Sequence, residues 1–225
     1  MSNKHQTSLE KEFELERVIL FSDAVFAIAI TLLVIDIKFP ELPEKRVEGN
    51  ISELIQPMVR SFVAFALSFF FIGRSWSTHL RLFRLLKKYD QGLINRNLLC
   101  LFFIVTFPFS ASGIAGHVRG GFLLPVYVYI FNLAAVSITH FIICRYILHV
   151  KPWLAIDGEA AEKKYTYFSS MYVAIAMGVM CVIIVGIGLL LPKQESYIGF
   201  SCILVAPLLG IAKRKSKKYK PVERS

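Results

Sequence analysis

Long apolar blocks separated by short polar connections dominate the pattern of hydrophobic and polar positions along this 225-residue chain. A helix that crosses a bilayer needs about 20 mostly apolar residues, with a range of about 17–25. Measured by that length, the blocks near residues 17–37, 55–77, 97–116, 122–146, 168–191 and 197–212 are predicted spans. The last block is the shortest, and one bent helix in place of the last two is the alternative. The pattern predicts an all-α membrane protein with six transmembrane helices.

The composition agrees with this pattern. Hydrophobic residues make up 55% of the chain and charged residues 19%, with a mean hydropathy of +0.56. Soluble domains average about 45–50% apolar and about 25% charged residues. All four cysteines fall inside the apolar blocks, without a CxxC pair or a disulfide-framework spacing, so we interpret them as small buried hydrophobes.

The net charge of +10 is typical of a nucleic-acid binder only if the basic residues form a patch. Here the Lys and Arg side chains lie almost entirely between the apolar blocks. If the N-terminus is inside the cell, the cytoplasmic segments hold 20 of the 26 basic residues. Because basic residues are retained on the cytoplasmic side, we expect both termini to be cytoplasmic. No nucleic-acid partner is predicted.

Three regions follow from these boundaries. Residues 1–16 form a cytoplasmic N-terminal segment, whose acidic character is unlike the basic leader of a secretory signal. Residues 17–212 form the six-helix unit, and residues 213–225 form a polybasic cytoplasmic tail. The basic run Lys213–Lys220 is a topology anchor or, alternatively, a contact for anionic lipid head groups.

Ionisable and polar residues of the first two spans gather at one depth. They are Arg17, Ser22 and Asp23 in the first span and Arg74, Trp76 and His79 at the end of the second. Ionisable residues inside a membrane are expensive and are functional candidates by default. We predict that Asp23 pairs with His79, or alternatively with Arg74. Such a pair acts either as a clamp between helices or as a proton sensor.

A helical wheel places a stripe without charge on the first span. Ile28, Thr31, Leu32 and Ile35 share one face, whereas Asp23 lies about 140° from Ile28 at 100° per residue. The acid therefore points between helices and does not line the surface that the stripe faces. Taken alone, such a stripe is typical of contact with lipid or with a protein core.

The motifs of enzymes and metal sites are missing from the sequence. No acidic ring near mid-membrane and no TVGYG-type carbonyl filter occurs. His140 and Cys144 lie four residues apart, but two ligands do not make a metal site. No catalytic triad order, HExxH motif or phosphate-binding loop is found. We therefore predict no enzyme activity, no cofactor and no bound metal.

The first span carries Arg17-x-x-x-Phe21-Ser22-Asp23, followed by a long apolar run to Val34. This segment resembles the signature first helix of the transmembrane protein 175 family of potassium channels. Further matching segments are Trp76-x-x-His79, Asn97-Leu-Leu and Phe107-Pro108-Phe109. Leu80 departs from the pattern, because a second His is common there in bacterial members.

The resemblance implies a homotetramer of six-helix chains around a pore lined by the first helix. Ile28 then forms the narrowest hydrophobic layer, Leu32 and Ile35 form further layers, and the Thr31 hydroxyl favours potassium. The residues implied to hold the helices together are Arg17, Phe21, Ser22, Asp23, Trp76 and His79. These positions predict a passive, weakly selective cation channel that favours potassium, in a prokaryotic plasma membrane.

Two other functions compete with the channel. A proton-coupled secondary transporter would use Asp23 and His79, with His140, as a relay. Transporters often contain internal repeats, but residues 17–116 and 122–212 show no convincing similarity. A membrane scaffold that transports nothing is the third alternative.

Overall fold

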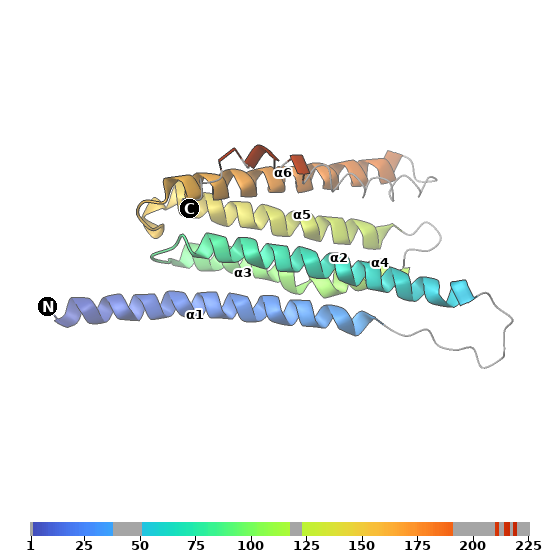
Figure 1. Cartoon of the computed structure of the whole chain (residues 1–225), viewed down its shortest axis with the longest axis horizontal. Helices are drawn as coiled ribbons and strands as arrows, with labels where there is room; N and C mark the ends of the chain where they lie inside the picture. The colour runs from blue at the N-terminus through green and yellow to red at the C-terminus, as the bar shows by residue number, and fades with distance from the viewer. Residues whose placement is uncertain are drawn as a thin grey trace, which may run out of the picture.

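The computed structural model describes residues 2–37, 51–117 and 123–190, with the short stretches 210–211, 214–216 and 218–219. Within those residues the chain is helical and forms an elongated bundle (Figure 1). The helices are α1 (Ser2–Leu32), α2 (Ile51–Phe83), α3 (Gln91–Val105), α4 (Phe107–His117), α5 (Leu124–Arg145) and α6 (Ala160–Leu190). Short 3-10 or π-helical turns follow α1 at Leu33–Asp36 and α5 at Tyr146–Val150 and Pro152–Leu154. The prediction of an all-α protein is confirmed.

Five helical segments of the described chain are long and apolar enough to cross a bilayer. They are Phe13–Ile35, Met58–Phe83, Gln91–Ile114, Leu124–Val150 and Ala160–Leu190. The first five predicted spans each overlap one of these, although their ends differ by several residues. Helix α6, which corresponds to the fifth predicted span, begins earlier than predicted. Its first turns contain polar residues such as Glu162, which lie before the apolar block. The predicted sixth span, 197–212, lies outside the described residues apart from 210–211.

One membrane segment is built from two helices, α3 and α4, which meet at a turn at Thr106. Pro108 explains the break, because proline lacks an N–H and its ring clashes with the carbonyl four residues earlier. Polar side chains gather beside it: Asn132 on α5 donates to the Ser110 hydroxyl at 3.2 Å, and the Thr106 hydroxyl donates to the Asn132 carbonyl oxygen at 3.4 Å. These bonds give buried hydroxyls partners where the helix is interrupted. Pro125, by contrast, lies in the first turn of α5, where proline is tolerated.

Helix α5 is the centre of the bundle. It lies between α6 on one side and the layer of α2, α3 and α4 on the other, and α1 covers the far side of that layer (Figure 1). Its buried residues run along its whole length and around its circumference, including Val126, Tyr129, Val136 and Ile143. By comparison α1 has one buried stripe. The core is therefore built around α5, and α1 packs against the outside of it.

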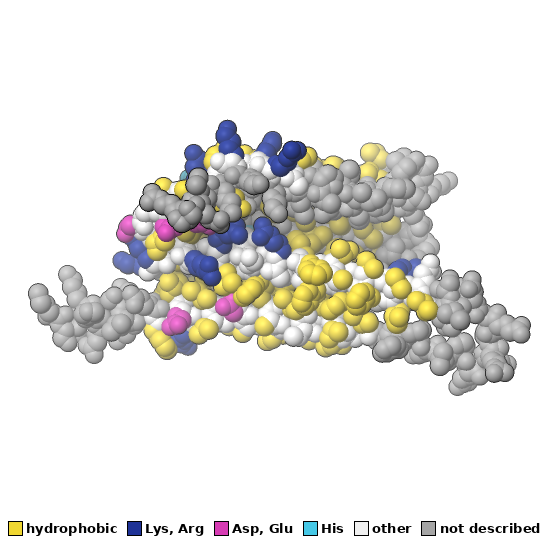
Figure 2. Space-filling view, viewed as in Figure 1, with side chains coloured by type: hydrophobic (Ala, Val, Ile, Leu, Met, Phe, Trp, Pro, Cys, Tyr) yellow, Lys and Arg dark blue, Asp and Glu magenta, His cyan; other side chains and the backbone are white. Residues whose placement is uncertain are grey.

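The loops after α2 and after α5 are joined at one end of the bundle. The Ile156 amide donates to the Leu85 carbonyl at 2.8 Å, and the Lys87 ammonium donates to the Asp157 carboxylate at 2.7 Å. The hydrogen bond from Lys87 and its positive charge lower the pKa of the Asp157 carboxyl. Figure 2 shows Lys and Arg side chains gathered toward this end, with apolar side chains over much of the rest of the face. The described surface thus has one basic end and a long apolar body.

Candidate functional site on the first helix

Helix α1 has two faces with opposite environments. Ser22, Phe26, Ala29 and Leu33, spaced four, three and four residues apart, are at most 2% exposed. This spacing matches the 3.6-residue period of a helix. Phe26, Ala29 and Leu33 share a core cluster with side chains of α2, α3, α4, α5 and α6. This face fixes α1 on the bundle.

The other face of α1 carries the residues of the predicted stripe, and all of them are open in the single chain. Ile28 is 56% exposed, Leu32 41% and Ile35 66%, and Thr31 is also exposed. Phe21 continues the stripe toward the N-terminus and is 53% exposed. The stripe contains no charged side chain, and the described part of the chain leaves it largely exposed. It is therefore available to lipid or to another copy of the chain.

Thr31 is the polar member of the stripe. Its hydroxyl donates a hydrogen bond to the Ile28 carbonyl, 2.9 Å away in the same helix. Because the proton is used inside the helix, the oxygen lone pairs remain available on the exposed side. This arrangement presents a hydrogen-bond acceptor, which suits a cation or the water around it.

Ser22 attaches α1 to α3. The Asn97 side-chain amide of α3 donates to the Ser22 hydroxyl oxygen at 2.9 Å, and that hydroxyl donates to the Val18 carbonyl at 2.8 Å. Asn97 and Ser22 are both buried, at 1% and 0% exposed. A buried polar link of this kind fixes the rotation of α1, because turning the helix would leave the buried Asn97 amide without its acceptor.

Asp23, the next residue, attaches α1 to α2. The Trp76 indole N–H donates to the Asp23 carboxylate at 2.9 Å, and both side chains are partly open. The prediction that Asp23 pairs with His79 or Arg74 is therefore wrong. Successive helix residues point about 100° apart, so Ser22 and Asp23 bond to two different helices.

His79 lies deeper in the bundle than predicted. Its ring stacks on Phe83 with centroids 4.2 Å apart, lies 5.3 Å from the Phe26 ring and meets the His140 ring edge-on at 5.8 Å. It is 2% exposed, and neither ring nitrogen has a hydrogen-bond partner among the described residues. Leaving a buried polar group unpaired costs about 1–3 kcal/mol. His79 thus contacts the buried face of α1 through Phe26 and does not contact Asp23 as an ion-pair partner.

Arg17 belongs to another contact at the end of the bundle. The Tyr89 hydroxyl donates to the Glu14 carboxylate, and this bond raises the pKa of the Tyr89 phenol, while the charge of Arg17 nearby lowers it. Among the described residues, no ion pair joins Arg17 to Asp23. The predicted set of Arg17, Asp23 and His79 is thus divided among three neighbourhoods of the structure.

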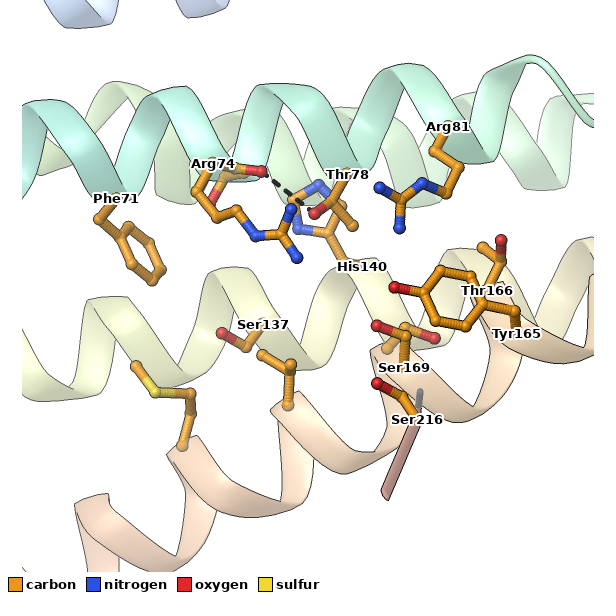
Figure 3. A pocket seen from close by; sticks show the side chains of 14 residues that line it. Phe71, Arg74, Thr78, Arg81, Ser137, His140, Tyr165, Thr166, Ser169 and Ser216 are labelled. Atoms are coloured by element: carbon orange, nitrogen blue, oxygen red, sulfur yellow. Dashed lines mark hydrogen bonds between the residues drawn. The ribbon is translucent and has the colours of Figure 1, made fainter. Parts of the chain in front are cut away.

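A polar cavity of about 440 Å³ opens between α2, α5 and α6, away from α1. Two arginines, several hydroxyl groups and His140 border it, as Figure 3 shows. Arg81 also forms an ion pair of 3.9 Å with Glu162. Arg74 therefore lies on this side of α2, which explains why it does not reach Asp23.

Comparison with known proteins relates this geometry to a family. The family model described as endosomal/lysosomal potassium channel TMEM175 matches residues 17–108, which contain both faces of α1 with α2 and α3. The crystal structure of a lysosomal potassium-selective channel TMEM175 homologue from Chamaesiphon minutus superposes with a TM-score of 0.60 at 26% identity, covering 92% of this chain and 96% of the other. The chain is thus similar to this family over residues 17–108 and to this solved structure over most of its length.

The chain is also similar to individual bacterial proteins. A potassium channel of Streptomyces collinus is 36% identical over 103 residues, which is 46% of this chain and 48% of the relative. A potassium channel of a Chryseobacterium species is 29% identical over 156 residues, covering 69% of this chain and 76% of the relative. The alignment thus spans about half of the first relative and about three quarters of the second.

Proposed function

We propose that this chain is a member of the TMEM175 family and acts as a passive cation channel that favours potassium with weak selectivity. The observation that carries the proposal is the stripe of α1, which is exposed, apolar and free of charge on a helix whose other face is fixed in the core. Bacterial relatives support the same ion, since two of them are named potassium channels and the matched crystal structure is of a homologue of a potassium-selective channel.

A pore along this stripe requires several copies of the chain. One helix cannot enclose a path. Helix α1 lies at the edge of the protomer (Figure 1), and its stripe is exposed. We propose a homotetramer in which four α1 helices turn Ile28, Leu32 and Ile35 toward the symmetry axis. Homo-oligomers with closed symmetry place the same patch of each copy around one axis, so a single stripe per chain is sufficient.

The ion must cross this pore with most of its water. Transfer of a bare ion into an apolar medium costs tens of kcal/mol by Born solvation, and the apolar side chains of the stripe offer no ligands in exchange. A narrow apolar ring gates by losing its water. Ile28 is the proposed constriction, and opening means separating the four Ile28 side chains until water enters.

Selectivity is assigned to Thr31. Its hydroxyl proton is donated to the Ile28 carbonyl, so four Thr31 oxygens would face the axis as acceptors. One layer of hydroxyl oxygens replaces few of the water ligands of an ion. The discrimination between potassium and sodium is therefore modest.

The links of α1 to α2 and α3 set the direction of the stripe. Ser22 with Asn97, and Asp23 with Trp76, hold the helix at one rotation. Arg17 and Phe21 precede these residues on α1 and His79 follows Trp76 on α2, and we assign the whole group the role of a helix clamp. Movement of the clamp would rotate or tilt α1 and so change the opening at Ile28.

We place both termini in the cytoplasm and the channel in a prokaryotic plasma membrane. The gathering of basic side chains at the end of the bundle where α1 begins supports this orientation (Figure 2). In this arrangement residues 1–16 precede the channel unit, 17–212 cross the membrane, and 213–225 form the polybasic tail. Its basic run Lys213–Lys220 is a topology anchor or, alternatively, a contact for anionic lipid head groups.

A proton-coupled transporter that uses Asp23 and His79 finds less support. Asp23 bonds to Trp76, and His79 has no polar partner among the described residues. A proton relay needs groups joined by hydrogen bonds or water. The two residues named for it lie in different environments.

Flux through liposomes tests the proposal. Purified protein in vesicles loaded with potassium should release it down its gradient without ATP, and release sodium more slowly. The mass of the detergent-solubilised protein should correspond to four chains. Flux no greater than in empty vesicles, or substrate-dependent proton uptake without a potassium current, would overturn the channel assignment.

A further inference from the structure

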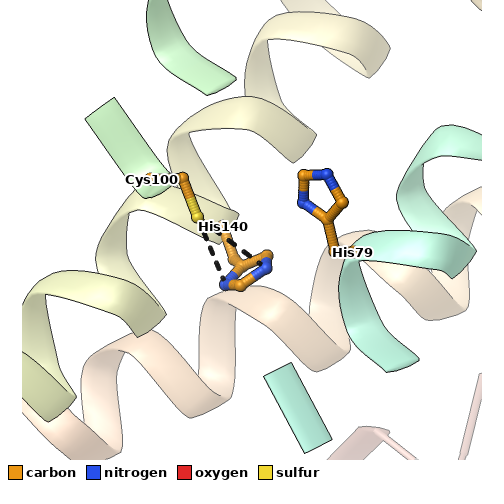
Figure 4. A group of neighbouring side chains, drawn as sticks. All are labelled: His79, Cys100 and His140. Carbon is orange, nitrogen blue, oxygen red and sulfur yellow. Dashed lines mark hydrogen bonds between the residues drawn. The ribbon is translucent and has the colours of Figure 1, made fainter. Parts of the chain in front are cut away.

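His79, Cys100 and His140 meet in the interior of the bundle, as Figure 4 shows. They come from three helices, α2, α3 and α5, and are 2%, 0% and 4% exposed. One ligand atom from each lies within 4.8 Å of the other two. No carboxylate belongs to the group, and it is separate from the exposed stripe of α1.

The surroundings of His140 set which of its nitrogens can bind a ligand. Its Nδ1 lies 2.9 Å from the Val136 carbonyl. A carbonyl oxygen only accepts hydrogen bonds, so Nδ1 carries the proton and Nε2 keeps its lone pair. Histidines that bind metals are commonly oriented in this way, with the other ring nitrogen donating to a backbone carbonyl.

His79 is the second observation that points to a ligand. Its ring is held between Phe26 and Phe83, and neither nitrogen is hydrogen-bonded within the part of the chain that the structure describes. A neutral imidazole has one donor and one acceptor nitrogen. The acceptor nitrogen of His79 is thus unused, although the ring is tightly packed and buried. It lies beside the Cys100 thiol and the His140 imidazole.

We propose that His79, Cys100 and His140 bind one soft or borderline transition-metal ion, zinc(II) or copper(I). Thiolate and imidazole ligands select these ions, whereas potassium, magnesium and calcium prefer oxygen ligands. Neighbouring ligand atoms in a tetrahedral zinc site are about 3.4–3.6 Å apart, given Zn–N near 2.0–2.1 Å and Zn–S near 2.3 Å. The Cys100 Sγ lies 3.9 Å from each His140 nitrogen, so a small inward shift of the side chains completes the site.

The two ions differ in the number of ligands that they require. Copper(I) with one thiolate is neutral and is satisfied by three ligands, which suits a buried site. Zinc(II) takes a fourth ligand, and the cavity that His140 borders gives water a route to the metal (Figure 3). In both cases the Cys100 thiol gives up its proton to solvent as the sulfur–metal bond forms. The bound ion cross-links α2, α3 and α5 behind the buried face of α1.

Metal content measured on the full chain tests the site. The protein is purified with a tag that contains no histidine, stripped with a chelator, and loaded in separate arms with zinc(II) or with copper(I) under anaerobic reducing conditions. After dialysis, wild-type protein should retain about one ion per chain of at least one metal. Cys100→Ala and His79→Gln should weaken binding at least tenfold, since loss of even an outer-shell partner costs about 10–100-fold.

Cys144→Ser is the matched control, because Cys144 is equally buried on the same helix as His140 but outside the cluster. It should bind like the wild type. X-ray absorption of the loaded wild-type protein needs no variant and should show one sulfur and two nitrogen neighbours. Equal metal retention by wild type and Cys100→Ala, or a spectrum without sulfur, would overturn the proposal. Metal binding is measured without ion flux, so its failure is distinct from failure of the channel.

Discussion

The two faces of α1 consist of similar apolar side chains in opposite environments. Phe26 is 1% exposed and Leu33 2%, whereas Phe21 is 53% and Ile28 56% exposed. Inside a membrane both kinds of surface are apolar, because lipid tails are as apolar as leucine. The difference lies in the contacts. One face packs against the core of the same chain, and the other is available to lipid or to another copy of the chain. Stability should therefore depend on the first face and conduction on the second.

The largest expected effect is the loss of stability caused by a substitution on the buried face of α1. Phe26→Ala removes a ring from the core beside His79, and substitutions of this type cost about 3–5 kcal/mol of folding free energy. Thermal unfolding of the detergent-solubilised protein should show a large fall in the midpoint. Phe13→Ala, at a position of the same helix that is 62% exposed, is the control and should change stability by less than about 0.5 kcal/mol. Equal losses in the two variants would show that the faces are not distinct.

The second prediction concerns conduction through the exposed face. Ile28→Asn should place polar groups in the proposed constriction, keep it wet and raise the resting potassium leak. An increase of about tenfold corresponds to a barrier lower by about 1.4 kcal/mol. Liposome flux measures it, with Val34→Asn as the control at a similarly exposed position, 53%, outside the stripe. An unchanged leak in Ile28→Asn would show that Ile28 does not gate.

The third prediction tests the clamp that orients the two faces. Ser22→Ala leaves the buried Asn97 amide without its acceptor, at a cost of about 1–3 kcal/mol in stability. The double variant Ser22→Ala with Asn97→Leu removes both partners and should recover much of that loss. Thermal unfolding of the two single variants and the double variant gives the coupling energy. Additive losses would mean that the observed hydrogen bond does not link α1 to α3.

The fourth prediction is a smaller change in selectivity. Thr31→Val keeps the size of the side chain but removes the acceptor oxygen from the stripe. The potassium-to-sodium permeability ratio should fall a few-fold toward one, while the total flux stays measurable. Thr31→Ser keeps the hydroxyl and should retain the ratio. A ratio unchanged in Thr31→Val would remove Thr31 from the selectivity assignment.

The smallest expected effect on stability comes from the bond between Lys87 and Asp157, which lies away from both faces of α1. The pKa of Asp157 is lowered by this hydrogen bond and by the charge of Lys87. When a carboxyl has a lower pKa in the folded state than in the unfolded state, it stabilises the folded state at pH values above the unfolded-state pKa of about 3.9. That stabilisation is lost as the pH falls through the folded-state pKa. Asp157→Asn should therefore unfold at a slightly lower temperature at pH 7 and at the same temperature as wild type in strong acid. A difference that persists in acid would assign the effect to packing.

Much of the fold was accessible from the sequence because membrane spans follow from length and hydropathy. The first five spans were predicted from apolar blocks of about 20 residues, and each overlaps an apolar helical segment of the structure. Their ends were less accurate, since helices such as α6 continue into polar turns that the apolar pattern does not mark. The break at Thr106 could be anticipated only from Pro108.

The contacts of the site were only partly accessible. The helical wheel separated Asp23 from the stripe. The structure places Ile28 of the stripe on the exposed side of α1, away from the buried face. The partner of Asp23 was assigned wrongly, because charge favoured His79 while the fold brings Trp76 to it. The cluster of His79, Cys100 and His140 was missed, since its members are far apart in sequence and no spacing rule joins them.

By itself the sequence determined that this chain is a membrane protein, where its first spans lie, and which residues share a face of α1. These properties depend on hydropathy and on helix periodicity, which are local. Only the tertiary structure decided which face of α1 is buried, which helix each polar residue contacts, and that three distant metal-binding side chains meet. These properties depend on how helices pack against one another, and in an apolar solvent that choice is made by shape and by a few hydrogen bonds rather than by hydrophobicity.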